Sequence, residues 1–190
     1  MKIAVLALQG DFEEHEQVFK NLNISTCQIR QKKDLDQDIS GIVLPGGEST
    51  VQGKLLHSLD MFDKLKGLIT NGLPVMATCA GTILLAEHIL DDPTVHLGTL
   101  GITVKRNAYG RQISSSHIVG KFDYINDIPM SFIRAPQIEF CVPKVKVLAE
   151  HDGRITAVRQ DNQLAMTFHP ELGTDYRVAE YFLNEMVKKY

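Results

Sequence analysis

Cys79 stands in a setting that is typical of a cysteine nucleophile. It lies in the segment ATCAG at 77–81, after an apolar run that predicts a strand and before a predicted helix. Small residues on both sides allow the sharp turn of a nucleophile elbow, and the free amides of a helix N-terminus favour a thiolate. Most single cysteines are simply buried. Cys27 and Cys141 lack the small neighbours, so we expect no chemistry from them.

His169 is the histidine best placed to act as a base for such a cysteine. Glu171 follows it two positions later in FHPE, and in extended backbone these side chains point the same way. Glu171 could then fix one imidazole nitrogen and leave the other for the thiol. Alone, this short pattern is more often a surface pair. We expect the remaining histidines to be solvated or packed: His15, His57, His88, His96, His117 and His151.

A glycine-rich segment, PGGEST at 45–50, closes another apolar run. Two successive glycines let backbone amides approach a bound group, as an anion nest or as half of an oxyanion hole. A phosphate-binding P-loop is excluded, because Glu48 occupies the required glycine position and Leu55 replaces the Ser or Thr that would contact magnesium. The alternative is a flexible turn at a strand end.

Alternating strands and helices are predicted to hold these residues over the first 90 positions. The strands fall at 2–8, 24–30, 41–44 and 73–78, and the helices follow Asp11 and span 59–69 and 80–90. This order indicates right-handed βαβ units and a parallel sheet with helices on both faces. Sites in such sheets form at the carboxyl ends of the strands.

The second half is predicted to contain mostly short strands. They fall at 102–105, 132–134, 145–149 and in a hairpin from 154–159 through Asp161-Asn162 to 164–168, before a last helix at 175–189. Without a repeat or a linker, the 190 residues are expected to form one mixed α/β domain.

Composition narrows the function classes. Hydrophobic residues at 44% and charged residues at 23% are typical of a globular protein. A net charge of −3 disfavours nucleic acid as a partner, and the N-terminal apolar run is too short for a signal peptide or a membrane span. Three distant cysteines without a CxxC pair predict neither a disulfide framework nor a zinc site. We therefore expect a cytoplasmic protein without metal or cofactor.

Five motifs together resemble a known family. They are LPGGEST at 44–50, TCAG at 78–81, RNAYGRQ at 106–112, FIRAP at 132–136 and FHPEL at 168–172. The sequence is similar to the glutaminase subunits of pyridoxal 5′-phosphate synthase, from LALQGD at 6–11 almost to the C-terminus. TCAG and HPE mark the wider class I glutamine amidotransferases, whereas RNAYGRQ and FIRAP resemble the vitamin B6 branch.

The resemblance implies one class I glutamine amidotransferase domain over residues 1–190. Its fold would be a flavodoxin-like three-layer α/β domain, with a central, mostly parallel sheet and additional short antiparallel strands in the second half. It would hydrolyse L-glutamine to L-glutamate and ammonia through a cysteine thioester. The ammonia would pass to a (β/α)₈-barrel synthase subunit within a hetero-oligomer, for pyridoxal 5′-phosphate biosynthesis.

The resemblance also implies a set of site residues. Cys79 would be the nucleophile, His169 the general base and acid, and Glu171 the residue that orients His169. Substrate contacts would carry over to Gly47, Glu48, Ser49, Arg106, Ile133 and Arg134. The oxyanion donors would be the amides of Gly47 and Ala80. Gln9 and Gly10 would lie near the oxyanion region and the partner contact, where docking of the synthase would set the strand and speed up a slow free subunit.

The sequence departs from the family pattern at two places. Ala77 stands where family members usually carry glycine, and because alanine is still small we expect the site to survive. Ser114, Ser115 and Ser116 follow Ile113 where the family commonly has an acidic and an aromatic side chain.

Three alternatives remain beside this interpretation. The chain could be the glutaminase of another amidotransferase, such as that of histidine biosynthesis, or a catalytically silent domain of the same fold. A cysteine hydrolase acting on peptides is disfavoured, because Glu48, Arg106 and Arg134 suit a small zwitterion better than a chain.

Overall fold

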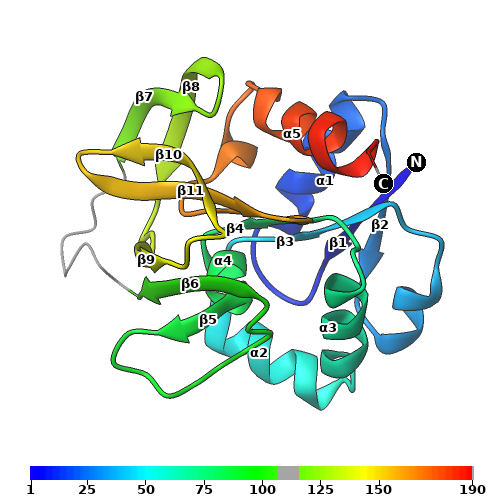
Figure 1. The fold of residues 1–190 in the computed structure, drawn as a ribbon. Helices are drawn as coiled ribbons and strands as arrows, with labels where there is room; N and C mark the ends of the chain where they lie inside the picture. The colour runs from blue at the N-terminus through cyan, green and yellow to red at the C-terminus, as the bar shows by residue number, and fades with distance from the viewer. Residues whose placement is uncertain (107–115, 190) are drawn as a thin grey trace.

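The computed structural model describes residues 1–106 and 116–189 (Figure 1). Residues 107–115 hold RNAYGRQ after its first residue, together with Ser114 and Ser115, and they lie outside the described residues, as does residue 190. Within the described part, no helix is long and apolar enough to cross a membrane.

The described residues form one large sheet with the strand order β2-β1-β3-β4-β12-β11-β9-β6-β5, and β10 pairs with β11 beside this path. The first five strands in this order run parallel. They are β2 (Ser25–Ile29), β1 (Lys2–Leu6), β3 (Gly41–Leu44), β4 (Val75–Thr78) and β12 (Gln163–Met166). This half of the sheet carries the sharp turn at which Cys79 lies.

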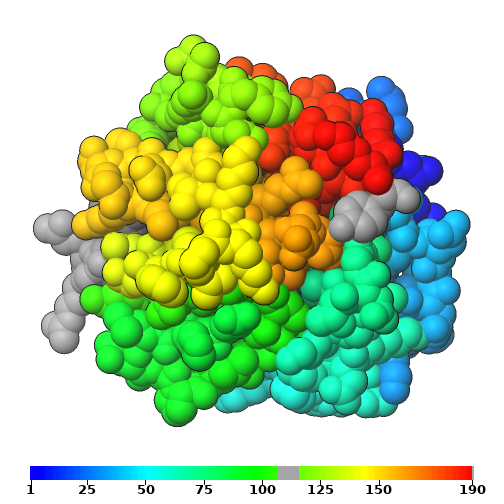
Figure 2. Space-filling view, in the orientation of Figure 1, coloured from blue at the N-terminus to red at the C-terminus, as the bar shows by residue number. Residues whose placement is uncertain are grey.

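Antiparallel pairing dominates the other half of the sheet. It contains β11 (Arg154–Gln160), β10 (Lys146–His151), β9 (Gln137–Cys141), β6 (Leu100–Lys105) and β5 (Ala86–Ile89), the last pairing in parallel with β6. A separate antiparallel hairpin consists of β7 (Ser116–Phe122) and β8 (Ile125–Phe132). In the space-filling view, the yellow and orange residues lie above the green and cyan residues (Figure 2).

Helices cover both faces of the parallel half (Figure 1). One face packs against α1 (Phe12–Asn21) and α5 (Arg177–Phe182), and the other against α2 (Ser49–Ser58), α3 (Phe62–Thr70) and α4 (Ala80–Leu85). In β1, the side chains of Ile3 and Val5 are buried in the core on the side of α1 and α5. Those of Ala4 and Leu6 are buried in the core on the side of α2, α3 and α4. Side chains alternate along a strand, so a strand covered on both faces is apolar throughout. The predicted three-layer α/β fold class is confirmed.

Several element boundaries differ from the sequence predictions. The helix predicted at 80–90 is wrong in its second half, because α4 ends at Leu85 and β5 follows, pairing with β6 from Ala86 to Ile89. An apolar run of this length fits a helix or a strand equally well, and pairing with β6 decides it. The last helix is also not regular to 189, since a π-helical turn, Leu183–Val187, follows α5.

The strand predicted at 132–134 is wrong as well. Phe132 ends β8, and Arg134 lies beyond it with a φ of 46°, in the left-handed region and not in extended backbone. The hairpin β7–β8 and helix α2 were not predicted, nor was the short 3-10 helix Lys32–Asp36. The predicted hairpin around Asp161-Asn162 is confirmed, because β11 and β12 pair up to Gln160 and Gln163.

Candidate active site

Cys79 occupies the turn between the central strand β4 and helix α4. Its φ of 45° lies in the left-handed region, which costs a non-glycine residue energy and persists only where the surrounding structure imposes it. Its backbone N–H donates to the Met166 carbonyl at 2.9 Å and so pins the turn to β12. Gly81 lets α4 pack close to β3, because a Cβ there would meet the Leu44 oxygen at 2.1 Å.

The departure at Ala77 does not prevent this turn. Ala77 is fully buried in β4, in register with Leu44 of β3 and Ala165 of β12. Its methyl group belongs to the same buried core as Ile83, Leu84 and Leu85 of α4. The sharp turn at Cys79 therefore forms with alanine at this position.

His169 and Glu171 form a buried pair just after β12. Nδ1 of His169 lies 2.7 Å from Oε1 of Glu171, and their side chains are 5% and 0% exposed. The backbone here is not extended as predicted, because a 3-10 turn, Pro170–Leu172, follows His169 and makes the contact. Glu171 fixes the proton on Nδ1, which leaves Nε2 free. Nε2 has no hydrogen-bond partner among the described residues.

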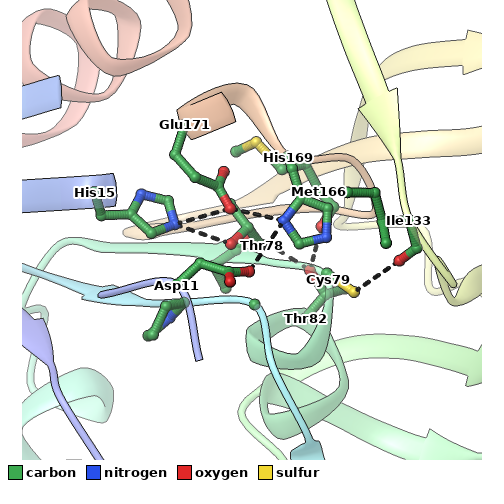
Figure 3. Close-up of polar contacts among 12 residues, drawn as sticks. Asp11, His15, Thr78, Cys79, Thr82, Ile133, Met166, His169 and Glu171 are labelled. Carbon is green, nitrogen blue, oxygen red and sulfur yellow. Dashed lines mark hydrogen bonds and ion pairs between the residues drawn. The ribbon is translucent and has the colours of Figure 1, made fainter. Parts of the chain in front are cut away.

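The imidazole of His169 lies between Glu171 on one side and Cys79 on the other (Figure 3). Burial lowers the pKa of His169, but the Cys79 side chain and the hydrogen bond and charge of Glu171 outweigh burial and raise this pKa to about 10. The sulfur and Nε2 do not complete a hydrogen bond. The thiol lies 3.9 Å from the Ile133 oxygen instead. Loose contacts of this kind are common in ligand-free catalytic sites and tighten with substrate.

Two further side chains join this cluster that sequence reasoning missed. Nε2 of His15 lies 3.1 Å from the Thr78 hydroxyl and 3.5 Å from Oε1 of Glu171. Oδ2 of Asp11 lies 3.5 Å from Nδ1 of His169, and burial raises the pKa of Asp11. A signal for His15 existed in the sequence, because its spacing to Val18 and Phe19 places it on the inner face of α1.

Asp11, His169 and Glu171 form a cluster in the described part of the chain that could be considered for a metal ion. Two ligands that each lie about 2 Å from a tetrahedral ion stand about 3.3 Å apart. Nδ1 and Oε1 are closer than this, at 2.7 Å, which suits a shared proton. The cluster is therefore better explained as a hydrogen-bonded pair with a neighbouring carboxylate.

A cavity of about 420 Å³ opens onto Cys79 and His169. Every residue that the resemblance assigned to substrate lines it: Gly47, Glu48, Ser49, Arg106, Ile133 and Arg134, together with Ala80. This volume suits a small molecule. Arg106 is held at the wall by an ion pair with Asp92 and a hydrogen bond of 3.0 Å to the Thr50 hydroxyl.

Gln9 and Gly10 are not among the residues that line the cavity. They pack against the glycine-rich segment 45–50. Oε1 of Gln9 accepts a hydrogen bond of 2.6 Å from the Glu48 amide, and the Gln9 carbonyl accepts one of 2.9 Å from Gln52. The Gly46 oxygen accepts a hydrogen bond of 3.2 Å from the Asp11 amide. The loop that carries Gly47 therefore takes its position from the end of β1.

The fold and the cavity define an α/β protein with a cysteine-centred site at the carboxyl edge of a parallel sheet. The model of the SNO glutamine amidotransferase family matches residues 5–188, and the chain belongs to this family. The predicted resemblance is confirmed.

Individual relatives agree with the family match. The chain is 52% identical to a protein of Methanocorpusculum labreanum named pyridoxal 5′-phosphate synthase subunit PdxT, over 98% of both chains. It is 49% identical to the Desulfitobacterium hafniense protein of the same name, over 98% of this chain and 94% of that one. A crystal structure of a glutamine amidotransferase matches with a TM-score of 0.93 at 39% identity, covering 98% of each chain.

More distant structures share the fold alone. A putative GMP synthase subunit from Thermoplasma acidophilum has a TM-score of 0.72 at 15% identity, covering 100% of this chain and 95% of that one.

Proposed function

We propose that this chain hydrolyses the side-chain amide of L-glutamine and supplies the ammonia to a pyridoxal 5′-phosphate synthase. The observation that carries the proposal is the placement of Cys79 on a strained elbow beside a cavity that His169 also lines. Family membership and the names of the PdxT relatives support the choice of glutamine over other amides.

The proposed reaction uses a Cys79–His169–Glu171 triad in two halves. The Cys79 thiolate attacks the amide carbon, and His169 carries the thiol proton on Nε2. When the tetrahedral intermediate collapses, the carbon–nitrogen bond breaks, His169 gives its proton to the nitrogen, and ammonia leaves a glutamyl thioester. Water that loses a proton to His169 then attacks the thioester, and glutamate leaves as the sulfur regains its proton.

Two further groups of residues take parts in this proposal. The amides of Gly47 and Ala80 stabilise the oxyanion that develops on the substrate oxygen, which is worth roughly a hundredfold to a thousandfold per donor in comparable enzymes. Glu48 and the guanidinium groups of Arg106 and Arg134 offer opposite charges to the ammonium and carboxylate of a free amino acid. This charge pattern disfavours a peptide substrate.

The partner in this proposal is a (β/α)₈-barrel synthase subunit that forms a hetero-oligomer with this chain. Gln9 and Gly10 lie behind the loop that carries Gly47, so docking near the end of β1 would act on the oxyanion donors. Residues 1–190 act as one class I amidotransferase domain. A cytoplasmic location suits three cysteines without a disulfide.

The test follows nitrogen from glutamine into product. The chain is mixed with the barrel subunit, sugar phosphates and glutamine labelled with ¹⁵N in the amide, and pyridoxal 5′-phosphate is analysed by mass spectrometry. With the barrel subunit, we expect pyridoxal 5′-phosphate that carries ¹⁵N. When the histidine-biosynthesis synthase and its substrate replace the barrel subunit, we expect no ¹⁵N in the product of that synthase. Glutamate release without labelled pyridoxal phosphate would point to another acceptor, and absence of glutamate would indicate a silent domain.

A further inference from the structure

His15 is a fully buried polar residue on the inner face of α1, where it follows the apolar spacing of Val18 and Phe19. A leucine or phenylalanine would fill this position without leaving a polar atom unpaired. Its Nδ1 indeed has no hydrogen-bond partner among the described residues. Burying this unpaired nitrogen costs folding free energy, so packing alone does not account for a histidine here. The other nitrogen, Nε2, does have polar neighbours.

Nε2 of His15 contacts two elements of the candidate site at once. It lies 3.1 Å from the hydroxyl of Thr78, the residue directly before Cys79, and 3.5 Å from Oε1 of Glu171. This is the same oxygen that lies 2.7 Å from Nδ1 of His169. Figure 3 shows the two imidazoles converging on Glu171 from opposite sides.

Within the described part of the chain, Glu171 has one unpartnered oxygen, so the contact of its other oxygen with His15 matters for its position. Its side chain is 0% exposed, and Oε2 has no hydrogen-bond partner among the described residues. Oε1 is therefore the oxygen that faces both His169, at 2.7 Å, and His15, at 3.5 Å. Without His15, the carboxylate would lose the side-chain contact that ties it to α1 and, through Thr78, to β4.

The charged and titratable groups facing His15 are Glu171, His169, Asp11 and Glu14. Burial lowers the pKa of His15, although the charge of Glu171 opposes this effect. A neutral imidazole carries one proton, and a proton on Nε2 lies between two oxygen acceptors, the Thr78 hydroxyl and Glu171.

We propose that His15 is a positioning residue of the glutaminase reaction, which holds the carboxylate of Glu171 and the strand end at Thr78 in register so that His169 faces Cys79. This inference rests on the proposed function. His15 touches neither substrate nor sulfur, and it acts through Glu171 and Thr78.

Two substitutions of His15 separate positioning from packing. His15→Phe keeps the ring volume but removes the N–H donor, whereas His15→Gln fills the space less well but keeps an N–H at similar reach. A positioning role predicts that Gln retains activity better than Phe. A packing role predicts the opposite order, so the two variants discriminate without reference to the size of either effect.

The measurement is steady-state glutamine hydrolysis in the assembled complex with the barrel subunit, over a range of pH. For His15→Phe we expect kcat to fall roughly tenfold to a hundredfold, the range found when a residue that orients a metal ligand is removed from other enzymes, with little change in KM. The high-pH limb of kcat/KM should move to lower pH, because a less well-fixed Glu171 holds the imidazolium of His169 less strongly. His15→Gln should restore most of kcat.

A milder pair of variants covers the case in which His15→Phe does not fold. Thr78→Val removes the hydroxyl beside His15 with little change in shape, and Thr156→Val is its matched control, since the Thr156 hydroxyl is also buried and has no partner among the described residues. We expect Thr78→Val to lower kcat and Thr156→Val to leave kcat unchanged. In a double-mutant cycle, Thr78→Val should cost little once His15 is Phe.

The outcomes distinguish this inference from the function on which it rests. A wild-type complex without glutaminase activity would overturn both. An active wild type with an unchanged kcat and pH profile in His15→Phe, or with Phe more active than Gln, would overturn the role of His15 alone. If His15→Phe does not fold, unchanged kcat in Thr78→Val would have the same consequence.

Discussion

Nδ1 of His169 and Oε1 of Glu171 lie 2.7 Å apart in a site almost closed to solvent. The carboxylate stabilises the protonated imidazole, and together with Cys79 it outweighs burial and raises the pKa of His169 from 6.5 to about 10. The folded protein therefore holds a proton on His169 over a pH range in which the unfolded chain has released it.

This pair predicts a dependence of stability on pH. His169 should stabilise the fold fully below about pH 6.5, and this contribution should disappear as the pH rises through about 10. Urea unfolding at pH 6.5, 8 and 10 measures it, with Glu171→Gln as the test variant. The control is Glu185→Gln, which alters a half-buried carboxylate that pairs with Lys189. The wild type and the control should lose more stability with rising pH than Glu171→Gln, and equal slopes in all three proteins would contradict the assignment.

Gly10 is predicted to be essential to the loop behind the cavity. It has a φ of +98°, and a Cβ there would lie 1.8 Å from the Gly46 oxygen. Gly10→Ala should cost at least about 1–2 kcal/mol from the backbone alone and should lower kcat by displacing Gly47. Gly67→Ala is the matched control, because a Cβ at this helical position meets nothing within 4 Å, and it should stabilise the protein by about 0.5–1 kcal/mol. Thermal unfolding and glutamine turnover decide the matter, and an equally stable, active Gly10→Ala protein would refute this reading of the loop.

Arg106 is predicted to bind the carboxylate of the substrate. Asp92 and Thr50 fix its guanidinium at the cavity wall, and a lysine cannot reproduce this fork. Arg106→Lys should raise KM roughly tenfold to a hundredfold, the value of a charge-assisted hydrogen bond, with a smaller effect on kcat. Arg177→Lys alters an arginine that pairs with Asp175 away from the cavity and should leave KM unchanged. A KM for Arg106→Lys equal to that of the wild type would remove Arg106 from the substrate site.

Docking of the barrel subunit is predicted to accelerate glutamine hydrolysis. The position of Gly47 depends on the Gln9 side chain, which accepts the Glu48 amide hydrogen bond at 2.6 Å, and a misplaced oxyanion donor costs roughly a hundredfold to a thousandfold. Turnover by the free chain should be slower than in the complex by up to this factor, and Gln9→Ala should lower the stimulation. Equal rates with and without the barrel subunit would contradict the gating of the loop.

The parallel half of the fold could be predicted from sequence because its strands are buried on both faces. The run at 41–44 is apolar at each position after Gly41, and turn residues follow it, so strand type and boundary were both readable. The strand at 86–89 could not be predicted, because the apolar spacing there is that of a helix and only the pairing with β6 makes it a strand. Local pattern carries no information about a partner strand more than ten residues away.

Part of the candidate site could likewise be predicted from the sequence, and part could not. Cys79 and the His169–Glu171 pair were identified from small residues and short spacing, although the backbone between His169 and Glu171 is a 3-10 turn and not extended. His15 and Asp11 were missed because α1 brings them to Glu171 and His169 across more than 150 positions of sequence. Only the packing of α1 against the sheet reveals that contact.

Cys79 alone among the three cysteines is predicted to be the nucleophile toward glutamine. Burial raises the pKa of both Cys27 and Cys141, which disfavours their thiolates, whereas Cys79 shares a cavity with His169. The direct test treats the complex with a glutamine analogue that carries an electrophilic ketone, followed by peptide mass spectrometry. We expect one adduct, on Cys79, that excess glutamine suppresses and that is absent from Cys79→Ala. Adducts on Cys27 or Cys141 with Cys79 unmodified would contradict the account.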